Sequence, residues 1–96
     1  MSAVELRNEG NKLFQRGEVE ASILRYSEAY KMAENDHLLT SNRSHAYFKK
    51  GDYVAALEDA ERTIELRPDW GKGYFRKGMA LKALGKFSVF SSAATF

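Results

Sequence analysis

Apolar side chains recur at helical spacing along much of the chain, and short polar turns separate the segments that carry them. Over residues 53–66 the positions on one helix face are Val54, Leu57, Ala60 and Ile64. The proline at position 68 ends this segment, because the residue before a proline avoids helical geometry. Residues 19–33 have a similar pattern, which predicts a second amphipathic helix.

The pattern repeats with a period of 34 residues. A shift of this length places Gly10 on Ser44 and Gly78, and it also places one glycine on another at positions 17, 51 and 85. Large side chains coincide at positions 13, 47 and 81. Periods of this size are typical of stacked helical hairpins. A small residue suits the point where two helices of a hairpin cross closely, and the large residue three positions later fills the space beside it.

An all-α fold follows from this repetition. We predict helices at about 4–16, 19–33, 37–50, 53–66 and 71–84. Gly17 and Gly51 suit the left-handed residue that ends a helix, and Asp52 suits the N-cap of the next one. We expect a single domain over residues 1–96. It divides into a first repeat at 3–36, a second at 37–70, an incomplete third at 71–87 and an atypical tail at 88–96.

The tail departs from the repeat pattern. The sequence SVFSSAATF carries no charge and shows no apolar stripe at helical spacing, so it predicts a weak helix at best. Terminal repeats normally need a polar outer face. We therefore expect an exposed apolar edge on the third repeat, through which the chain could self-associate.

Composition narrows the class of protein. A chain of 96 residues suits one small domain, and its net charge of +2 is too small to indicate nucleic acid or an anionic membrane as a partner. The chain has no cysteine, a charged N-terminal segment where a signal peptide needs an apolar run, and no stretch of the ~20 apolar residues that span a bilayer. These features predict a soluble cytoplasmic protein.

Two cations lie four residues apart in the predicted fifth helix. Lys72 and Arg76 therefore share one helix face, yet positions 71–85 contain no Asp or Glu that could pair with them. A solvated surface is the usual explanation for such a pair. A binding site for an anion is the alternative, and the decision depends on what else lies on the same side.

The 34-residue period, the Gly-acid turns and the sequences ALEDAERTIEL and TIELRPDW resemble the tetratricopeptide repeat (TPR) family over residues 3–87. The resemblance implies antiparallel helix pairs, about two and a half repeats, in a right-handed superhelix whose concave groove is lined by the first helix of each repeat. The sequences LRNEGNKLF, TSNRSHAYFKKGDY and PDWGKGYFRKG are similar to TPR domains of co-chaperones of the Hsp-organising type.

Those co-chaperone domains bind the C-terminal Glu-Glu-Val-Asp of the 70 and 90 kDa heat-shock proteins in a two-carboxylate clamp. The resemblance assigns the clamp to five residues of this chain: Arg7, Asn11, Asn42, Lys72 and Arg76. Four match the family in type. Position 7 carries arginine where the family usually has lysine, which keeps the charge but changes reach and donor geometry.

The physical chemistry of the five side chains agrees with this role. Packed helices lie ~8–10 Å apart, so long side chains from two flanking helices can converge over the helix between them. A terminal Asp offers two carboxylates, and three cations with two amides supply several donors for them. The same 34-residue shift suggests further groove positions: Phe14, Leu38, His45, Phe48, Lys49, Phe75 and Met79. Phe14, Phe48 and Phe75 could instead be core residues.

Other functions find less support in the sequence. No nucleophile–base pair, phosphate-binding glycine loop or metal-ligand spacing is present, so we expect neither an enzyme nor a metal or other cofactor. RNA binding through KGYFRKG is an alternative, but that segment is helical and the net charge is slight. The main alternative to a chaperone adaptor is a TPR scaffold that binds another protein, or itself, without using the clamp.

Overall fold

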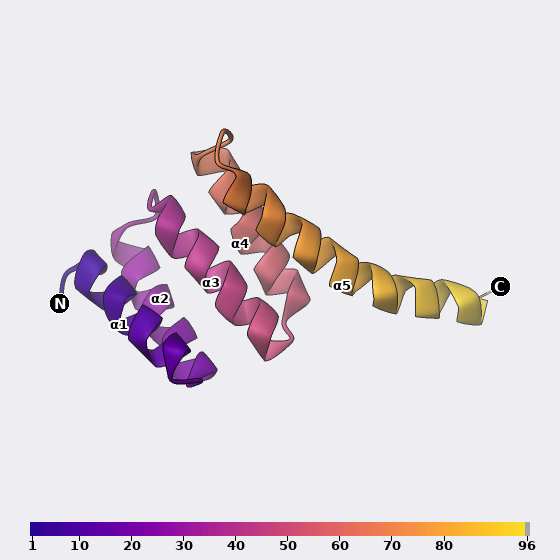
Figure 1. The fold of residues 1–96 in the computed structure, drawn as a ribbon, viewed down its shortest axis with the longest axis horizontal. Coiled ribbons are helices and arrows are strands. Elements are labelled where there is room, and N and C mark those ends of the chain that lie inside the picture. Colours follow the sequence, from indigo (N-terminus) through magenta and orange to yellow (C-terminus); the bar gives the residue numbers. More distant parts are fainter. Residues whose placement is uncertain (96) are drawn as a thin grey trace.

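The computed structural model describes the backbone of residues 1–95 and the side chains of residues 1–85. Five helices account for the regular structure of this range (Figure 1). Their bounds are α1 Ala3–Gln15, α2 Val19–Met32, α3 His37–Lys50, α4 Tyr53–Leu66 and α5 Gly71–Thr95. The prediction of an all-α fold is therefore confirmed, and the first four helices begin and end within one residue of their predicted positions.

Local chemistry at the helix ends explains this agreement. Gly17 and Gly51 have positive φ angles of 83° and 91°, the left-handed conformation that glycine adopts without steric cost. Asp52 caps α4 by accepting a hydrogen bond from the backbone N–H of Ala55, as predicted. Asp36 caps α3 in the same way, and Ser2 with Glu5 forms a reciprocal capping box at the start of α1.

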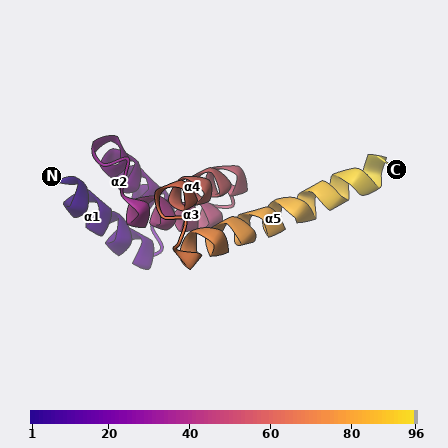
Figure 2. The same cartoon turned by 90° about the horizontal axis from the view of Figure 1, so that it is seen from above.

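The helices form two antiparallel hairpins and a fifth helix that packs on the second hairpin. α1 packs on α2, α3 packs on both α2 and α4, and α5 packs on α4 and α3. Figure 2 shows the resulting layers, with α1, α3 and α5 toward one side and α2 and α4 toward the other. Helices α1 and α5 each contact α3, so these three form a continuous surface.

The crossing of α1 and α2 depends on Gly10, as the repeat pattern predicts. A Cβ atom at this position would lie 2.6 Å from the ring of Tyr26, so only glycine fits. The hydroxyl of Ser22 donates to the carbonyl of Gly10 across 2.9 Å. In the second hairpin the equivalent positions are Ser44 and Ala56, and here the donor is on the first helix: the hydroxyl of Ser44 donates to the carbonyl of Ala56 across 2.8 Å.

A buried ion pair lies within the second hairpin, and its arginine also contacts the first hairpin. Arg43 of α3 donates to both carboxylate oxygens of Asp59 on α4, across 2.7 and 2.9 Å, and the Asp59 side chain is fully buried. The guanidinium also lies 4.4 Å from the ring centre of Tyr30 on α2. Because a buried charge is tolerated only with a partner, this pair makes the contact among α2, α3 and α4 specific.

The third repeat differs from its prediction. The first helix of this repeat was expected to end near Leu84, with a weakly helical tail after it, but α5 continues without a break to Thr95. Gly85 does not have the positive φ of Gly17 and Gly51. Lys86 follows it where Asp52 follows Gly51, and a lysine side chain has no acceptor with which to cap a new helix. The prediction that this helix ends near Leu84 was therefore wrong.

One side of α5 is uncovered within the described side chains. Tyr74 and Leu81 are 51% and 47% exposed, whereas Leu6 and Thr40, the equivalents of Tyr74 in the earlier repeats, are buried. This agrees with the expected apolar edge on the third repeat. The side chains of the tail lie outside the described residues, and self-association remains a prediction.

Candidate functional site

A pocket of about 170 Å³ opens between α1 and α3. Its lining combines three amides with three rings: Asn11, Phe14, Gln15, Tyr26, Asn42 and His45. Four of these residues were predicted from the sequence as site residues. The helical spacing of Asn11 and Phe14 on α1, and of Asn42 and His45 on α3, turns both pairs toward the same space.

The two predicted asparagines share one hydrogen-bonded network. The Nδ2 of Asn42 donates to the Oδ1 of Asn11 across 3.0 Å. The hydroxyl of Tyr26 donates to the same oxygen across 2.5 Å. Asn11 thus accepts two hydrogen bonds within the protein, while its own NH2 group makes none among the described residues. This leaves N–H donors for a ligand.

His45 lies where the cations of α3 and α5 converge. Its ring packs against that of Phe14, with the centroids 4.8 Å apart. Burial, together with the charges of Arg76, Lys49 and Lys72, lowers the pKa of His45 to about 4. At neutral pH the imidazole is therefore uncharged, and the charges of Arg76, Lys49 and Lys72 act on it.

Arg76 is a donor without an acceptor. Its Nε is buried and has no hydrogen-bond partner, and burial lowers the pKa of its guanidinium. Lys72 lies 5.6 Å from the ring centre of Trp70, and neither cation forms an ion pair within the described residues. Lys77, the next residue on α5, is instead paired with Glu61 of α4 at 3.8 Å. The cations toward α3 are thus the unpaired ones.

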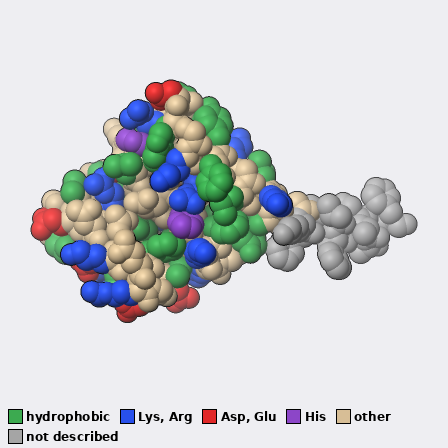
Figure 3. Space-filling view, viewed as in Figure 1, with side chains coloured by type: hydrophobic (Ala, Val, Ile, Leu, Met, Phe, Trp, Pro, Cys, Tyr) green, Lys and Arg blue, Asp and Glu red, His purple; other side chains and the backbone are tan. Residues whose placement is uncertain are grey.

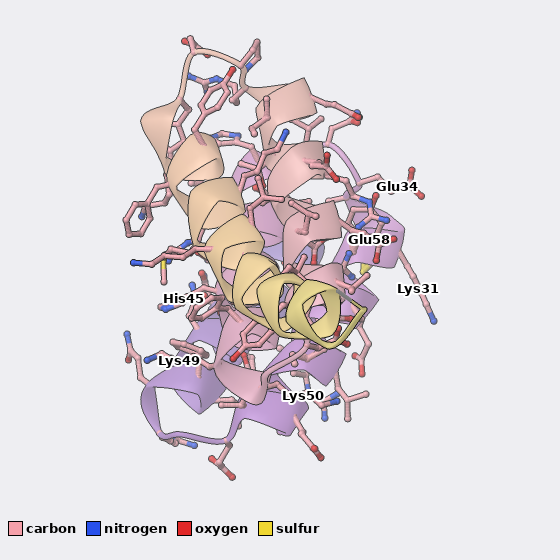
Figure 4. All side chains as sticks on the ribbon, turned by 90° about the vertical axis from the view of Figure 1, so that its right-hand side faces the viewer. Lys31, Glu34, His45, Lys49, Lys50 and Glu58 are labelled. Atoms are coloured by element: carbon pink, nitrogen blue, oxygen red, sulfur yellow. The ribbon has the colours of Figure 1, made fainter. Side chains whose placement is uncertain are left out.

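The distribution of charge over the surface agrees with this contrast. In Figure 3, Lys, Arg and His side chains gather at the centre of the face over α3 and α5, and Asp and Glu side chains lie around its rim. Figure 4 shows His45 and Lys49 projecting to one side of the molecule, while Glu34 and Glu58 project to the other. An anion approaching the centre of this face meets positive charge.

Arg7 differs from the other predicted clamp residues because it already has a carboxylate partner. Its Nη1 lies 2.6 Å from the Oδ2 of Asp36, and both side chains are only 18% exposed. The other oxygen of Asp36 caps α3 by accepting from the backbone N–H groups of Leu38 and Leu39. The guanidinium of Arg7 is therefore held at the start of α3.

A second pocket, of about 280 Å³, lies between α3 and α5. Its lining is mostly apolar with one cation: Phe48, Met79, Lys82 and Ala83. The ring of Phe48 rests on Tyr53, with the centroids 5.2 Å apart. Lys49, the next residue of α3, is exposed. We call the surface of α1, α3 and α5 that carries both pockets the groove.

Three predicted groove residues line neither pocket: Leu38, Lys49 and Phe75. Leu38 lies in the first turn of α3 and is 41% exposed. Phe75 is 60% exposed, and its ring lies 5.6 Å from the guanidinium of Arg76. The sequence left open whether Phe75 is a core residue, and its exposure shows that it is not.

Several residues of the site were not predicted. The hydroxyl of Tyr26, the carboxylate of Asp36 and the side chains of Gln15, Lys82 and Ala83 all take part. The sequence did offer a signal for Tyr26, because a tyrosine on the inner face of a helix needs a partner for its hydroxyl. Asp36 could have been recognised as an N-cap, although its contact with Arg7 is not visible in the sequence.

Other kinds of site find no support in the described part of the chain. There, no group of three His, Asp or Glu side chains is placed to hold a metal ion. No described helix is long and apolar enough to cross a membrane.

The fold and the groove define a class of helical-hairpin repeat domain, and comparison with solved structures identifies it. The second TPR of Spaghetti (RPAP3), bound to the HSP90 peptide SRMEEVD, has a TM-score of 0.85 and 31% sequence identity, over 92% of this chain and 82% of that one. The second TPR domain of human RPAP3, in complex with the HSP70 peptide SGPTIEEVD, gives a TM-score of 0.83 and 31% identity, over 90% of this chain and 72% of that one. The chain belongs to the tetratricopeptide repeat family.

Sequence comparison places it near a particular group of that family. The chain is 43% identical over 94 residues to the Hsp70-Hsp90 organizing protein of Triticum aestivum, a match that covers 98% of this chain and 16% of that protein. It spans about a sixth of the length of the curated relatives that it matches first. No protein-family model matches the chain.

Proposed function

We propose that the groove binds the acidic C-terminal tail of heat-shock protein 70 or heat-shock protein 90, which ends in Glu-Glu-Val-Asp. In this proposal the two carboxylates of the terminal Asp are held by a clamp formed by Arg7, Asn11, Asn42, Lys72 and Arg76. The chain then acts as a co-chaperone adaptor, which tethers whatever protein carries it to a chaperone. It acts by binding alone, without catalysis, and it works in the cytoplasm where these chaperones meet their co-chaperones.

Two donors without acceptors, on the helices that flank α3, carry this proposal. Arg76 has a buried Nε without an acceptor, and the NH2 group of Asn11 makes no hydrogen bond within the described residues. A buried polar group without a partner costs stability unless a ligand or water satisfies it. A carboxylate is the ligand that suits a guanidinium and an amide NH2 together.

The second pocket suits the residue that precedes the acidic pair in such tails. The two peptides of the solved complexes have Met or Ile before Glu-Glu-Val-Asp. Phe48 and Met79 offer an apolar surface for either side chain, and a thioether adapts to both shapes. Lys49 and Lys82 lie beside this pocket, where they can attract the glutamates of the tail.

Micromolar affinity is the expected strength. A hydrogen bond to a charged group contributes roughly 1.5–3 kcal/mol. Several such bonds together outweigh the cost of ordering a short peptide, but that cost removes part of their contribution. A dissociation constant of 1 μM corresponds to about 8 kcal/mol. Because charge dominates, affinity should fall as salt concentration rises.

Calorimetric titration tests the proposal directly. The peptides SRMEEVD and SGPTIEEVD would each be titrated as the free acid and as the C-terminal amide, which removes one carboxylate. We expect micromolar binding of the acids and at least tenfold weaker binding of the amides. Arg76→Ala should weaken binding of the acids by a similar factor. Lys77→Ala is the matched control, because Lys77 lies next to Arg76 but is paired with Glu61.

The exposed side of α5 supports a second candidate, a TPR scaffold that binds another protein or a second copy without the clamp. Tyr74 and Leu81 are half-exposed there. If the folded chain binds neither peptide in either form, the adaptor proposal is wrong. Sedimentation would then test the scaffold, which requires that Leu81→Asp abolish a concentration-dependent increase in mass.

A further inference from the structure

Tyr26 reaches the groove from the far layer of the molecule. It belongs to α2 and is 2% exposed, yet its hydroxyl donates to the Oδ1 of Asn11 across 2.5 Å. Asn42 of α3 donates to the same oxygen. Side chains of α1, α2 and α3 therefore meet at one acceptor, the Oδ1 of Asn11, on the wall of the pocket between α1 and α3.

We propose that Tyr26 is a positioning residue, which orients the amide of Asn11 so that its NH2 group is left for a ligand, and that this orientation makes the pocket select a carboxylate. The inference rests on the proposed function and adds the residue that sets the polarity of the site. Tyr26 acts through Asn11, so it need not contact the ligand.

The two asparagines alone could adopt either of two orientations. In the observed one, Asn42 donates to Asn11 and the NH2 group of Asn11 is left for a ligand. If both amides were reversed, Asn11 would donate to Asn42, and carbonyl oxygen rather than NH2 would be turned to the pocket at Asn11. A carbonyl oxygen repels a carboxylate, so the second orientation would disfavour the proposed ligand at Asn11.

The phenol proton of Tyr26 decides between these orientations. A buried hydroxyl needs an acceptor, and Asn11 supplies it only when its Oδ1 faces Tyr26. Burial also raises the pKa of Tyr26, which keeps the hydroxyl protonated and able to donate. In the reversed arrangement the NH2 group of Asn11 would face the hydroxyl, and the phenol proton would lose its acceptor.

The position of the hydroxyl is fixed by packing. The ring of Tyr26 lies against Gly10, so closely that a Cβ there would be 2.6 Å from two ring carbons. Gly10 precedes Asn11 on α1, so the ring and its hydrogen bond engage consecutive residues of one helix. The ring of Tyr26 can therefore not move closer to α1.

Tyr26→Phe tests the proposal, because it keeps the ring and removes only the hydroxyl. Binding of the free-acid and amide forms of SRMEEVD would be measured for the wild type, for Tyr26→Phe and for Tyr30→Phe. Tyr30 is the matched control: it lies one turn further along α2, and its hydroxyl makes no hydrogen bond in the described structure. We expect Tyr26→Phe to weaken acid binding about five- to twentyfold and amide binding less than twofold.

The ratio of acid to amide affinity separates orientation from general loosening. A merely structural loss would weaken both peptides equally and leave the ratio unchanged, and this result would overturn the proposal. An unchanged acid affinity in Tyr26→Phe would also overturn it. If the wild type binds neither form, the proposed function fails, and the proposed role of Tyr26 fails with it. If the wild type binds the acid and Tyr26→Phe binds it with the same affinity, the role of Tyr26 alone is overturned.

Asn11→Asp provides a second test that does not depend on Tyr26→Phe folding well. An aspartate keeps the oxygen that accepts from Tyr26 and Asn42, and it replaces the outward NH2 by a second oxygen. The urea midpoint of unfolding should therefore stay near that of the wild type, while acid binding falls at least a hundredfold. A large loss of stability would show that the NH2 group of Asn11, and not its oxygen, faces Tyr26, and it would overturn the proposal.

Discussion

Arg7 of α1 and Asp36 at the N-cap of α3 form an ion pair of 2.6 Å between two largely buried side chains. The carboxylate of Asp36 thus already pairs with the guanidinium of Arg7, which in the proposed clamp would bind a carboxylate of the peptide. Lysine, the usual residue at this position of the clamp, has no planar fork with which to hold a carboxylate in two directions. The arginine of this chain can be shared between Asp36 and a ligand, at the cost of competition between them.

Asp36→Asn should therefore strengthen peptide binding. Asparagine is as good an N-cap as aspartate, so α3 keeps its cap, while the guanidinium of Arg7 loses its internal anion. We expect affinity for the free-acid peptide to rise about threefold, and stability to fall by about 1 kcal/mol. Calorimetry and urea unfolding measure the two effects.

The control for this prediction is Asp52→Asn. Asp52 caps α4 through the N–H of Ala55 and forms no ion pair with a described residue. Asp52→Asn therefore changes the net charge and the capping side chain as Asp36→Asn does, but breaks no ion pair. Equal strengthening by both variants would show a general charge effect. Weaker binding by Asp36→Asn would mean that Asp36 orients Arg7 for the ligand and does not compete with it.

His45 should make the stability of the domain depend on pH between about 6.5 and 4. Its pKa in the folded protein is about 4, against an ordinary value of 6.5, because of burial and the nearby cations. Above pH 6.5 the imidazole is neutral in both states and contributes nothing. As pH falls below 6.5 the unfolded state takes up a proton and the folded state does not, so the free energy of unfolding decreases until about pH 4.

Urea unfolding at pH 7.5 and pH 5 measures this effect. After allowance for partial exposure to solvent, the contribution of His45 over this interval should be about 1 kcal/mol. His45→Gln should remove that part of the pH dependence, and His37→Gln, which changes the histidine packed edge-on against Trp70, should retain it. An identical loss of stability in the wild type and in His45→Gln would contradict the assignment.

Local chemistry made much of the fold predictable from the sequence. The ends of α3 and α4 are set by Asp52, Gly51 and Pro68, whose effects act within a few residues. The end of α5 was not predictable by aligning Gly85 with Gly51. A glycine ends a helix only where the chain turns back, and the turn at Gly51 also depends on the cap that Asp52 supplies to the next helix.

The site was predictable to the extent that it depends on helix faces. Asn11 and His45 are equivalent positions under the 34-residue period, and Asn42 lies three residues before His45 on the same face of α3, so all three line one pocket. The contacts of Arg7 with Asp36 and of Tyr26 with Asn11 depend instead on how three helices cross. Those crossings are fixed by side-chain packing throughout the domain, so no short stretch of sequence encodes them.

The buried ion pair should be a main determinant of stability. Asp59→Ala would leave the guanidinium of Arg43 without its partner in a nearly buried position, and we expect unfolding to become easier by about 3–5 kcal/mol. Arg62→Ala is the control, because Arg62 also contacts Asp59, at 3.1 Å, but its side chain is 42% exposed. This variant should cost less than about 1 kcal/mol. Comparable losses in the two variants would show that burial does not decide the strength of the contact.

Gly10 and Gly78 occupy equivalent positions of the first and third repeats, and alanine should affect them in opposite directions. At Gly10 the added Cβ would lie 2.6 Å from the ring of Tyr26, so the ring or a helix must move, and overpacking of this kind costs about 1–3 kcal/mol. At Gly78 no heavy atom lies within 4 Å and the backbone is helical, so alanine should stabilise the domain by about 0.5–1 kcal/mol. Thermal and urea unfolding of the two variants measure both effects.

Because the ring of Tyr26 carries the hydroxyl that orients Asn11, Gly10→Ala should also weaken acid binding, and Gly78→Ala should leave it unchanged. Destabilisation by Gly78→Ala would show that another segment covers this side of α5 in solution.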